Sequence, residues 1–165
     1  MRARTFLPIV LLLAVACGGS STEPSNSSGS GSTGSTGSTL TATIDGAPWN
    51  PTQVTARLSL TTPGYLQVDT TDPALNLFSF AAGPSTGTFG TGTYAVGSSP
   101  TNASYVLPGG TTIWTAAAAR GSGSVTISSY SAANKTARGT FSFVLVNGAG
   151  GTKTVTNGNF NVTFP

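Results

Sequence analysis

The sequence predicts an all-β domain over residues 40–165, built as an antiparallel β-sandwich or closed β-barrel of about ten short strands, largely a meander. Apolar residues recur at every second position of short segments, which is the period of a half-buried strand. Gly, Pro and Asn fill the gaps between these segments, as turn-forming residues do. The run of alanines at 116–119 is too short to nucleate a helix.

Each expected strand follows from this alternation. In the segment 53–60, Val54, Ala56 and Leu58 share one face, while Thr55 and Arg57 share the other. One solvated face per strand is typical of antiparallel pairing. The expected strands, in chain order, are 40–45, 53–60, 64–69, 75–81, 91–96, 103–107, 111–119, 122–130, 137–147 and 152–164.

The segment 75–81 is apolar on both faces. Leu75 and Leu77 lie on one face, and Phe78 and Phe80 lie on the other. Because strands that are apolar on both faces are buried on both faces, this segment is expected to be a central strand covered on both sides.

The last predicted strand contains a glycine, Gly158. A glycine inside a strand often marks a β-bulge. The alternative is a two-residue hairpin turn at Asn157-Gly158. The bulge is favoured, because the flanking piece 152–156 is short for a separate hairpin strand.

The N-terminus predicts a lipoprotein signal peptide at residues 1–16. Arg2 and Arg4 precede an apolar stretch from Phe6 to Ala16, which is too short to span a bilayer. Small residues then lead to Cys17, the only cysteine, as in the lipobox of bacterial lipoproteins. Lipid on Cys17 would anchor the chain to a membrane. Gly19, rather than Asp, shortly after the cysteine favours the outer membrane of a bacterial cell envelope.

Residues 17–39 are expected to comprise the lipidated cysteine and a flexible linker. The stretch from 18 to 39 consists almost entirely of Gly, Ser and Thr and has no apolar residue to bury. A Gly/Ser chain of this length has a root-mean-square span of roughly 25 Å.

Composition excludes several classes of site and partner. The chain has no His, one Cys and four carboxylates, so a His-based triad, a zinc cage and a carboxylate-rich metal centre are not expected. From Cys17 onward, five scattered cations stand against four carboxylates, which does not make a nucleic-acid footprint. No catalytic residue, metal or cofactor is therefore predicted.

Several stretches resemble a known family. Residues 41–49, Thr-Ala-Thr-Ile-Asp-Gly-Ala-Pro-Trp, resemble the T-A-x-I-D-G-x-x-W opening of a family of bacterial lipoproteins of unknown function, common in Bacteroidetes. Four further stretches fit the same family: Gly-Thr-Tyr at 92–94, Gly-Ser-Val-Thr-Ile-Ser-Ser-Tyr at 123–130, Gly-Thr-Phe-Ser-Phe at 139–143 and Asn-Gly-Asn-Phe at 157–160. The resemblance implies an exported, anchored β domain and no particular activity.

The most conspicuous candidate site is Asp45-Gly46-Ala47-Pro48-Trp49. Trp49 is a candidate platform for stacking a sugar ring, with Asp45 accepting hydrogen bonds from its hydroxyls. The alternative, which we favour, is that Asp45-Gly46 forms a turn and Trp49 plugs one end of the core.

Other aromatic residues are candidates for a shared groove. Trp114, Tyr65, Tyr94, Tyr105 and Tyr130 all carry a polar atom suited to ligand contact, although such residues more often pack in a core or at its rim. Asp69 and Asp72 are expected in a solvated turn, because a calcium ion needs more oxygen ligands than they offer. Lys135 and Lys153 have no serine or other partner that sequence spacing identifies.

The function predicted from the sequence is that of a lipid-anchored, non-catalytic binding or interaction module. A glycan or another envelope protein is the expected partner, and nucleic acid is not. Three alternatives remain. The first is a structural or accessory subunit of an envelope assembly, which an exposed strand edge would favour, and the second is a lipocalin-like carrier of a small molecule, which a closed barrel with an apolar interior would favour. The third is an enzyme such as a hydrolase, which a buried carboxylate or lysine with a shifted pKa beside a cleft would favour.

Overall fold

The computed structural model describes residues 37–98 and 100–165. The predicted signal peptide, Cys17 and most of the predicted linker lie outside the described residues. Within them the chain forms eleven strands, and all strand pairs are antiparallel. This part of the chain holds no helix of the length and apolarity needed to cross a membrane. The prediction of an antiparallel all-β fold is confirmed.

All ten predicted strands are present, and one more was not predicted. The strands are β1 (Thr39–Ile44), β2 (Ala47–Trp49), β3 (Gln53–Ser59), β4 (Tyr65–Thr71), β5 (Leu77–Ala82), β6 (Gly92–Ala95), β7 (Asn102–Val106), β8 (Ile113–Ala116), β9 (Ser122–Ser131), β10 (Thr136–Asn147) and β11 (Thr152–Thr163). The unpredicted strand is β2, whose three residues include Pro48, a residue that sheets accept at their edges.

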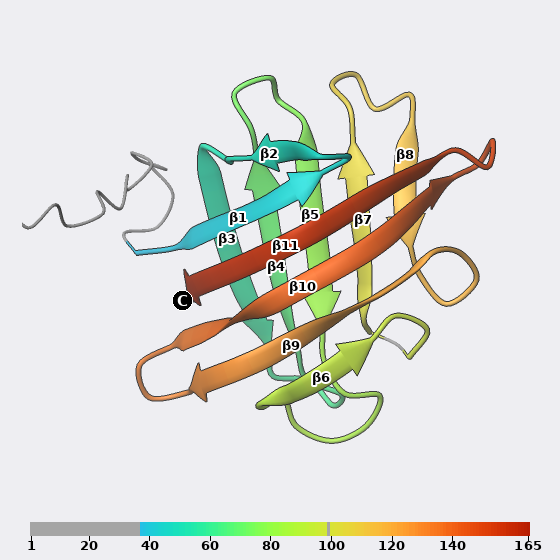
Figure 1. The fold of residues 1–165 in the computed structure, drawn as a ribbon. Helices are drawn as coiled ribbons and strands as arrows, with labels where there is room; N and C mark the ends of the chain where they lie inside the picture. Colours follow the sequence, from blue (N-terminus) through green and yellow to red (C-terminus); the bar gives the residue numbers. More distant parts are fainter. Residues whose placement is uncertain (1–36, 99) are drawn as a thin grey trace, which may run out of the picture. The chain divides into compact units, whose positions relative to one another are not determined.

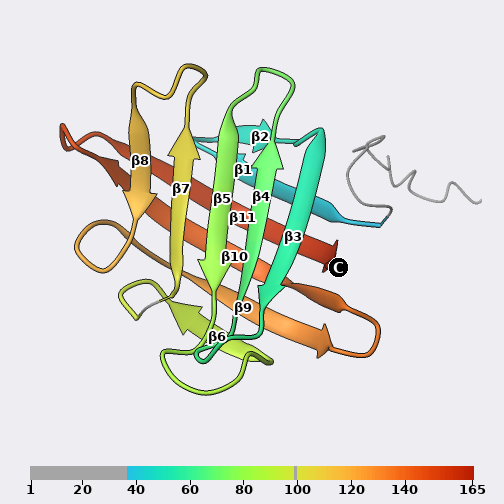
Figure 2. The same ribbon diagram turned by 180° about the vertical axis from the view of Figure 1, so that it is seen from behind.

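The strands form one curled sheet with two layers. In Figure 1, β2, β1, β11, β10, β9 and β6 form the layer in front, and β8, β7, β5, β4 and β3 cross behind it; Figure 2 shows the same layers from behind. The layers are joined where the end of β10 pairs with β8, through Val146 with Thr115 and Asn147 with Trp114. On the other side, β3 pairs with β4 and β2 with β1, and neither has a second partner. The domain is therefore a half-barrel, intermediate between the two predicted alternatives.

Aromatic rings fill the space between the layers. Phe78 of β5 is fully buried, and its ring centroid lies 5.5 Å from that of Phe141 on β10. Phe80 lies 4.9 Å from Phe141 and 5.5 Å from Phe160. These contacts join β5 of one layer to β10 and β11 of the other. The aromatic cluster is therefore one part of the core through which the two layers pack against each other.

Three glycines of the front layer lie opposite phenylalanines on neighbouring strands. The pairs are Gly139 with Phe160, Gly158 with Phe141, and Gly123 with Phe143. A Cβ atom at Gly158 would lie 2.5 Å from two ring atoms of Phe141, and one at Gly123 would lie 2.5 Å from the Phe143 ring. The missing side chain therefore makes room for the neighbouring ring. All three pairs lie within the stretches that resemble the lipoprotein family.

The turn between β1 and β2 is the one predicted at Asp45-Gly46. Ile44 pairs with Ala47, so the hairpin loop has two residues, and both have positive φ, 50° at Asp45 and 82° at Gly46. Positive φ at both central positions defines a type I′ turn, for which Asp-Gly is a preferred sequence.

Strand β11 contains the predicted bulge. Phe141 pairs with Gly158 while Phe143 pairs with Val155, so three steps along β11 match two along β10. The extra residue reverses the alternation of faces, which lets both Val155 and Phe160 point into the core. Asn157 takes a φ of 52° at this place, a conformation that Asn tolerates better than most residues. The hairpin alternative is excluded, since β11 continues through the bulge.

The prediction that the segment 75–81 is covered on both faces is wrong. Phe78 and Phe80 enter the core, but Leu77 on the opposite face is 48% exposed, and Leu75 lies in the preceding loop and is 68% exposed. The outer face of β5 is not covered by another layer. Leu75 and Leu77 are therefore exposed apolar residues rather than part of a second buried face.

Candidate functional site

Four of the six predicted ligand-binding residues meet at one end of the half-barrel. Asp45 lies in the β1–β2 turn, and Trp49 lies in β2. Tyr105 on β7 and Trp114 on β8 are directly paired, with ring centroids 6.0 Å apart. The Tyr105 and Trp49 rings are 5.7 Å apart. The fifth member is Lys153 at the start of β11, which sequence reasoning did not select.

Lys153 connects the acidic turn to the aromatic rings. Its Nζ lies 2.8 Å from Oδ2 of Asp45, 4.9 Å from the centroid of the Trp114 ring and 5.2 Å from that of Tyr105. The backbone amide of Thr154 donates to Oδ1 of Asp45 at 2.8 Å, and the amide of Asp45 donates to the Thr154 carbonyl. The hydrogen bond from Lys153 is the largest of the effects that hold the pKa of Asp45 below its usual value. The turn is thus fixed to β11 by one ion pair, one backbone–backbone hydrogen bond and one hydrogen bond from the Thr154 amide to the Asp45 carboxylate.

Trp49 lies in the core. The residue is 5% exposed, and its Nε1 donates to Oγ1 of Thr70 at 3.3 Å. Thr70 in turn donates to the carbonyl of Phe78 at 2.8 Å, so the buried hydroxyl is satisfied. The Trp49 ring presents no free face on which a sugar could stack. Burial also raises the pKa of the Tyr105 phenol above its usual value, and this is the largest effect on that group.

Tyr65 and Tyr130 lie away from this cluster. Tyr130 packs against Phe89 at 5.0 Å and Phe164 at 6.2 Å, in a separate aromatic group that also contains Tyr94, whose ring stacks on Phe89. Tyr65 is half-buried at the start of β4. The predicted aromatic residues therefore do not form one groove.

Asp69 and Asp72 have separate structural roles. Asp69 lies within β4 rather than in the expected turn, and it forms an ion pair with Arg57 at 2.9 Å. Asp72 begins the β4–β5 loop and accepts from the backbone and side-chain amides of Asn76, at 2.8 and 2.7 Å. Among residues 37–98 and 100–165, no three acidic, His or Cys side chains are grouped so as to hold a metal ion.

Large exposed apolar side chains gather at the same end of the domain. Leu77, Val106 and Ile113 are register partners on the outer face of β5, β7 and β8, in the row next to the one that holds Tyr105 and Trp114. We call the exposed set the apolar rim, and it consists of Leu75, Leu77, Leu107 and Ile113. Six large apolar side chains are exposed among the described residues, and these four lie at adjoining ends of β5, β7 and β8 or in the loops next to those ends. A cluster of this kind on a folded domain usually marks a contact surface.

The most exposed residue of the rim is held in an unfavourable backbone conformation. Leu75 has a φ of 64°, although it is not a glycine. A bulky residue in this region costs roughly 1–2 kcal/mol. The loop is stabilised by the Asp72–Asn76 hydrogen bonds, and the Leu75 amide donates to the Asp72 carbonyl at 3.0 Å. Strain of this kind concentrates at functional sites.

The Asp45–Lys153 ion pair gives a prediction for acid stability. Asp45→Asn keeps an acceptor for the Thr154 amide and tolerates the positive φ, but it removes the charge. Because Asp45 is 43% exposed, we expect a loss of only about 0.5 kcal/mol at pH 7. The pKa of Asp45 is lower in the folded than in the unfolded chain, so its stabilisation is complete above the unfolded pKa and is lost as the pH falls through the folded pKa.

Urea denaturation at pH 7 and at about pH 2.5 measures this difference in the full-length chain. The wild type and Asp45→Asn should differ at pH 7, and the difference should shrink at the acidic pH. Asp45→Ala should cost about 1 kcal/mol more, because alanine does not favour positive φ. A gap between wild type and Asp45→Asn that stays constant over this pH range would contradict the assignment.

The rim and Lys153 were not identified from the sequence. The apolar character of Leu75 and Leu77 predicts burial, and nothing in the local pattern distinguishes an exposed leucine from a covered one. Lys153 lies 108 positions from Asp45. Their contact depends on strand order and register, which one sequence does not reveal.

Comparison with known proteins adds a family and no activity. Searches among curated proteins and among solved structures each gave no match. A family profile described as a domain of unknown function, DUF6252, matches residues 37–163, which include every strand of the half-barrel and the whole cluster around Lys153. The chain therefore belongs to the DUF6252 family.

Proposed function

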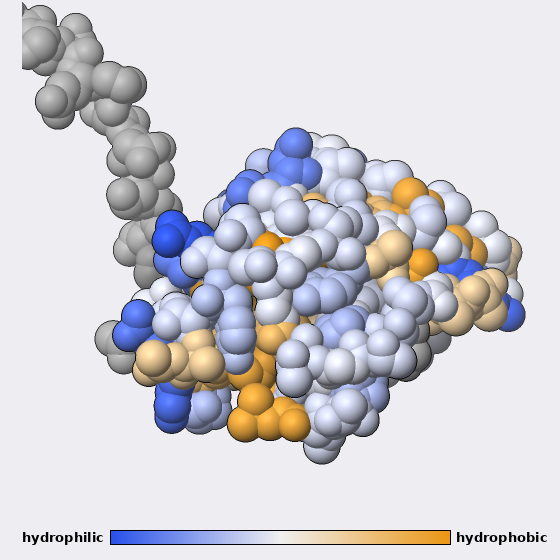
Figure 3. Space-filling model, turned by 90° about the horizontal axis from the view of Figure 1, so that it is seen from below, coloured by the Kyte–Doolittle hydropathy of each residue, from blue (hydrophilic) through white to orange (hydrophobic). Residues whose placement is uncertain are grey.

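We propose that this protein is a lipid-anchored component of the bacterial cell envelope, held in the outer membrane, whose half-barrel domain binds another envelope protein without catalysis. The observation that carries the proposal is the apolar rim. The surface of the domain is otherwise rich in Ser, Thr and Gly; Figure 3 shows one face as mostly white and pale blue, with orange in a few separate places. An exposed apolar cluster in such a setting is best explained by a partner that covers it.

The surroundings of the rim favour a protein partner over a sugar. The rim consists of aliphatic side chains, whereas sugar rings are generally held by exposed aromatic faces, and Trp49 offers none. The half-exposed Asp45–Lys153 pair at the same end adds polar groups beside the apolar centre. An apolar centre with a polar border is the usual anatomy of a protein interface.

The position of the rim suits an anchored protein. Strand β1 begins at Thr39, close to where the predicted linker joins, and ends beside Asp45 at the rim end of the domain. A strand of this length covers about 20 Å. The rim is therefore separated from the point of attachment by the length of the strand.

The alternatives are less well supported. A carrier of small molecules needs an internal cavity, whereas packed phenylalanine rings occupy the centre of the half-barrel. Catalysis needs an available acid or base, but Asp45, Asp69 and Asp72 are each engaged by a neighbouring side chain. An accessory subunit that adds a strand to a partner has one observation in its favour, the unpaired edge of β3.

Co-purification tests the rim. We expect the full-length protein, isolated from detergent-solubilised membranes, to carry one partner in a fixed ratio, and we expect Leu75→Ser with Leu107→Ser to lose it. Leu60→Ser is the matched control, because Leu60 is 84% exposed and lies in the β3–β4 loop, outside the rim. If the rim variant retained the partner as the Leu60→Ser control does, the rim would not be the binding surface. Hydrolysis by the pure protein that a single Ser or Asp substitution abolishes would overturn the non-catalytic assignment.

Substitution of Cys17 tests the anchor. Cys17→Ala should prevent incorporation of labelled fatty acid and should release the protein from the membrane fraction, since no other cysteine is present. Fractionation of inner and outer membranes then locates the wild type. Unchanged membrane association and labelling in the Cys17→Ala variant would contradict lipid anchoring.

A further inference from the structure

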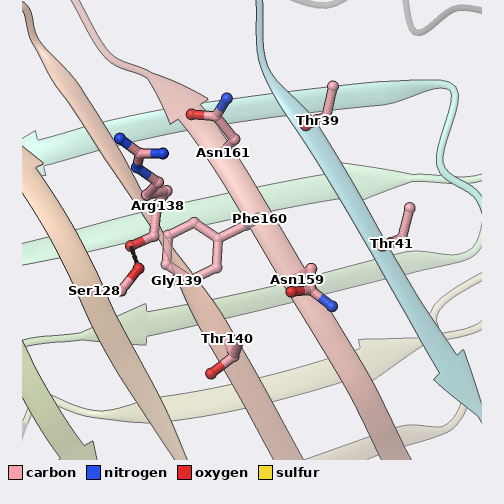
Figure 4. Close-up of a pocket in the computed structure, with 9 residues that line it drawn as sticks. All are labelled: Thr39, Thr41, Ser128, Arg138, Gly139, Thr140, Asn159, Phe160 and Asn161. Carbon is pink, nitrogen blue, oxygen red and sulfur yellow. Dashed lines mark hydrogen bonds between the residues drawn. The ribbon is translucent and has the colours of Figure 1, made fainter. Parts of the chain in front are cut away.

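A polar hollow lies on the outer face of the front layer, away from the apolar rim. Its volume is about 370 Å³. We call it the polar trough, and it is defined by six outward side chains, Thr39 and Thr41 of β1, Asn159 and Asn161 of β11, and Arg138 and Thr140 of β10. Figure 4 shows these side chains on three neighbouring strands, with Phe160 directed toward Gly139.

Strand register arranges the trough in two rows. Thr39, Asn161 and Arg138 are partners in one row. The second row consists of Thr41, Asn159 and Thr140. Neighbouring strands are about 4.8 Å apart, so each row spans roughly 10 Å. Because the groups project from paired strands rather than from loops, their spacing is fixed before any ligand arrives.

Most hydrogen-bonding groups of the trough are unused by the protein. Asn159 donates to the carbonyl of Asn157 at 3.3 Å, and the backbone carbonyl of Arg138 accepts from Ser128 at 3.2 Å. Within the described part of the chain, the side chains of Arg138, Asn161 and Thr140 have no hydrogen-bonding partner. The trough therefore offers hydroxyl and amide groups that can both donate and accept.

The polar trough carries positive charge, from Arg138, and no negative charge. Arg138 forms no ion pair within the described residues, where the two ion pairs are Arg57–Asp69 and Lys153–Asp45. No carboxylate lines the trough. A guanidinium in a neutral polar setting is suited to a carboxylate, which it can bind through two parallel hydrogen bonds.

We propose that the polar trough binds an acidic polysaccharide, with Arg138 pairing with a uronate carboxylate and with Asn161, Asn159 and the threonines bonding to sugar hydroxyls. Nucleic acid and other polyphosphates fit less well, because they are held by clustered cations. An exposed contact of this kind is weak by itself, but a polymer presents many copies to many anchored proteins, and linked contacts strengthen one another. This site is separate from the apolar rim and does not depend on the function proposed for it.

The test is binding of the full-length protein to immobilised polygalacturonate, with immobilised neutral dextran as reference. The wild type should bind polygalacturonate saturably and dextran not at all. Arg138→Gln should raise the apparent dissociation constant about five-fold or more, the factor expected for an exposed charged contact repeated along a polymer. Arg120→Gln is the matched control, because Arg120 is also exposed and makes the same change in net charge from outside the trough.

Asn161→Ala separates sugar recognition from attraction by charge. It keeps the net charge and should weaken polygalacturonate binding about two- to five-fold, by loss of a hydrogen bond. Three results would overturn the proposal: no binding by the wild type, equal losses in Arg138→Gln and Arg120→Gln, or binding to inorganic polyphosphate that is as tight as to polygalacturonate and unaffected by Asn161→Ala. The last two would show adsorption of anions in general.

Discussion

Replacing Phe78 with alanine is expected to lower the free energy of unfolding by about 3–5 kcal/mol. Phe78 is fully buried on β5, and its ring contacts Trp49, Phe80, Phe141 and Phe143. Removing the ring opens a cavity between the two layers, where they have no backbone hydrogen bonds to each other. Since a domain of this size is stable by roughly 5–15 kcal/mol, the variant should be marginally folded.

Urea denaturation followed by tryptophan fluorescence measures the loss, because Trp49 lies against Phe78 with ring centroids 6.5 Å apart. Leu77→Ala is the matched control, one position earlier on the same strand and on the opposite face. As Leu77 is 48% exposed, its truncation should cost much less, about 1 kcal/mol or below. Similar losses in the two variants would contradict the assignment of faces on β5. Phe78→Leu, with a smaller expected loss, keeps the comparison usable if the alanine variant does not fold.

This strand also shows the limit of what the sequence predicts. Alternation locates β5 and places Phe78 and Phe80 on one face, because the side-chain period of a strand is a local property. Whether the other face is covered depends on the number of layers, and no local signal reports that. The pattern therefore assigns Leu75 and Leu77 to a buried face, whereas the structure exposes them at the rim.

The candidate site was predictable only in part, for a related reason. The residue types of Asp45-Gly46 indicate a turn, and the burial of Trp49 agrees with the general behaviour of tryptophan. The contact with Lys153 depends on the bulge in β11. Lys153 shares the face of Val155, and the bulge reverses the alternation before Phe160, so a regular strand could not direct all three toward the interior. A glycine in a strand indicates a bulge, but not which distant residue the bulge brings into contact.

The stretches that resemble the lipoprotein family have a physical explanation in the fold. Gly139 and Phe141 belong to one such stretch, and Gly158 and Phe160 to another. In the structure they form reciprocal pairs, with each glycine opposite the phenylalanine of the neighbouring strand. Phenylalanine covering a glycine across a strand pair is a recognised means of stabilising sheets. The motif therefore reports packing between β10 and β11, which is why it gives no information about activity.

Gly139→Ala is accordingly expected to destabilise the domain by about 3 kcal/mol or more, at the upper end of what overpacking usually costs. A Cβ atom at this position would overlap the carbonyl oxygen of Thr126 on β9 and would lie 3.0 Å from the tip of the Phe160 ring. The ring could turn aside, but the carbonyl belongs to the backbone of a paired strand. β9 and β10 would have to separate at the point where their register already shifts, between Arg138 and Gly139.

Gly148→Ala provides the control for this substitution. Gly148 lies in the β10–β11 loop, where an added Cβ atom would meet no other heavy atom within 4 Å, and its φ is not positive, so alanine should be neutral or slightly stabilising there. Thermal and urea unfolding of the full-length chain compare the two variants. If Gly139→Ala unfolded with the same midpoint as Gly148→Ala, close packing at Gly139 could not be the reason for glycine at this position. A large loss confined to Gly139→Ala would instead show that close packing of β10 against β9 and the Phe160 ring requires glycine at this position of the motif.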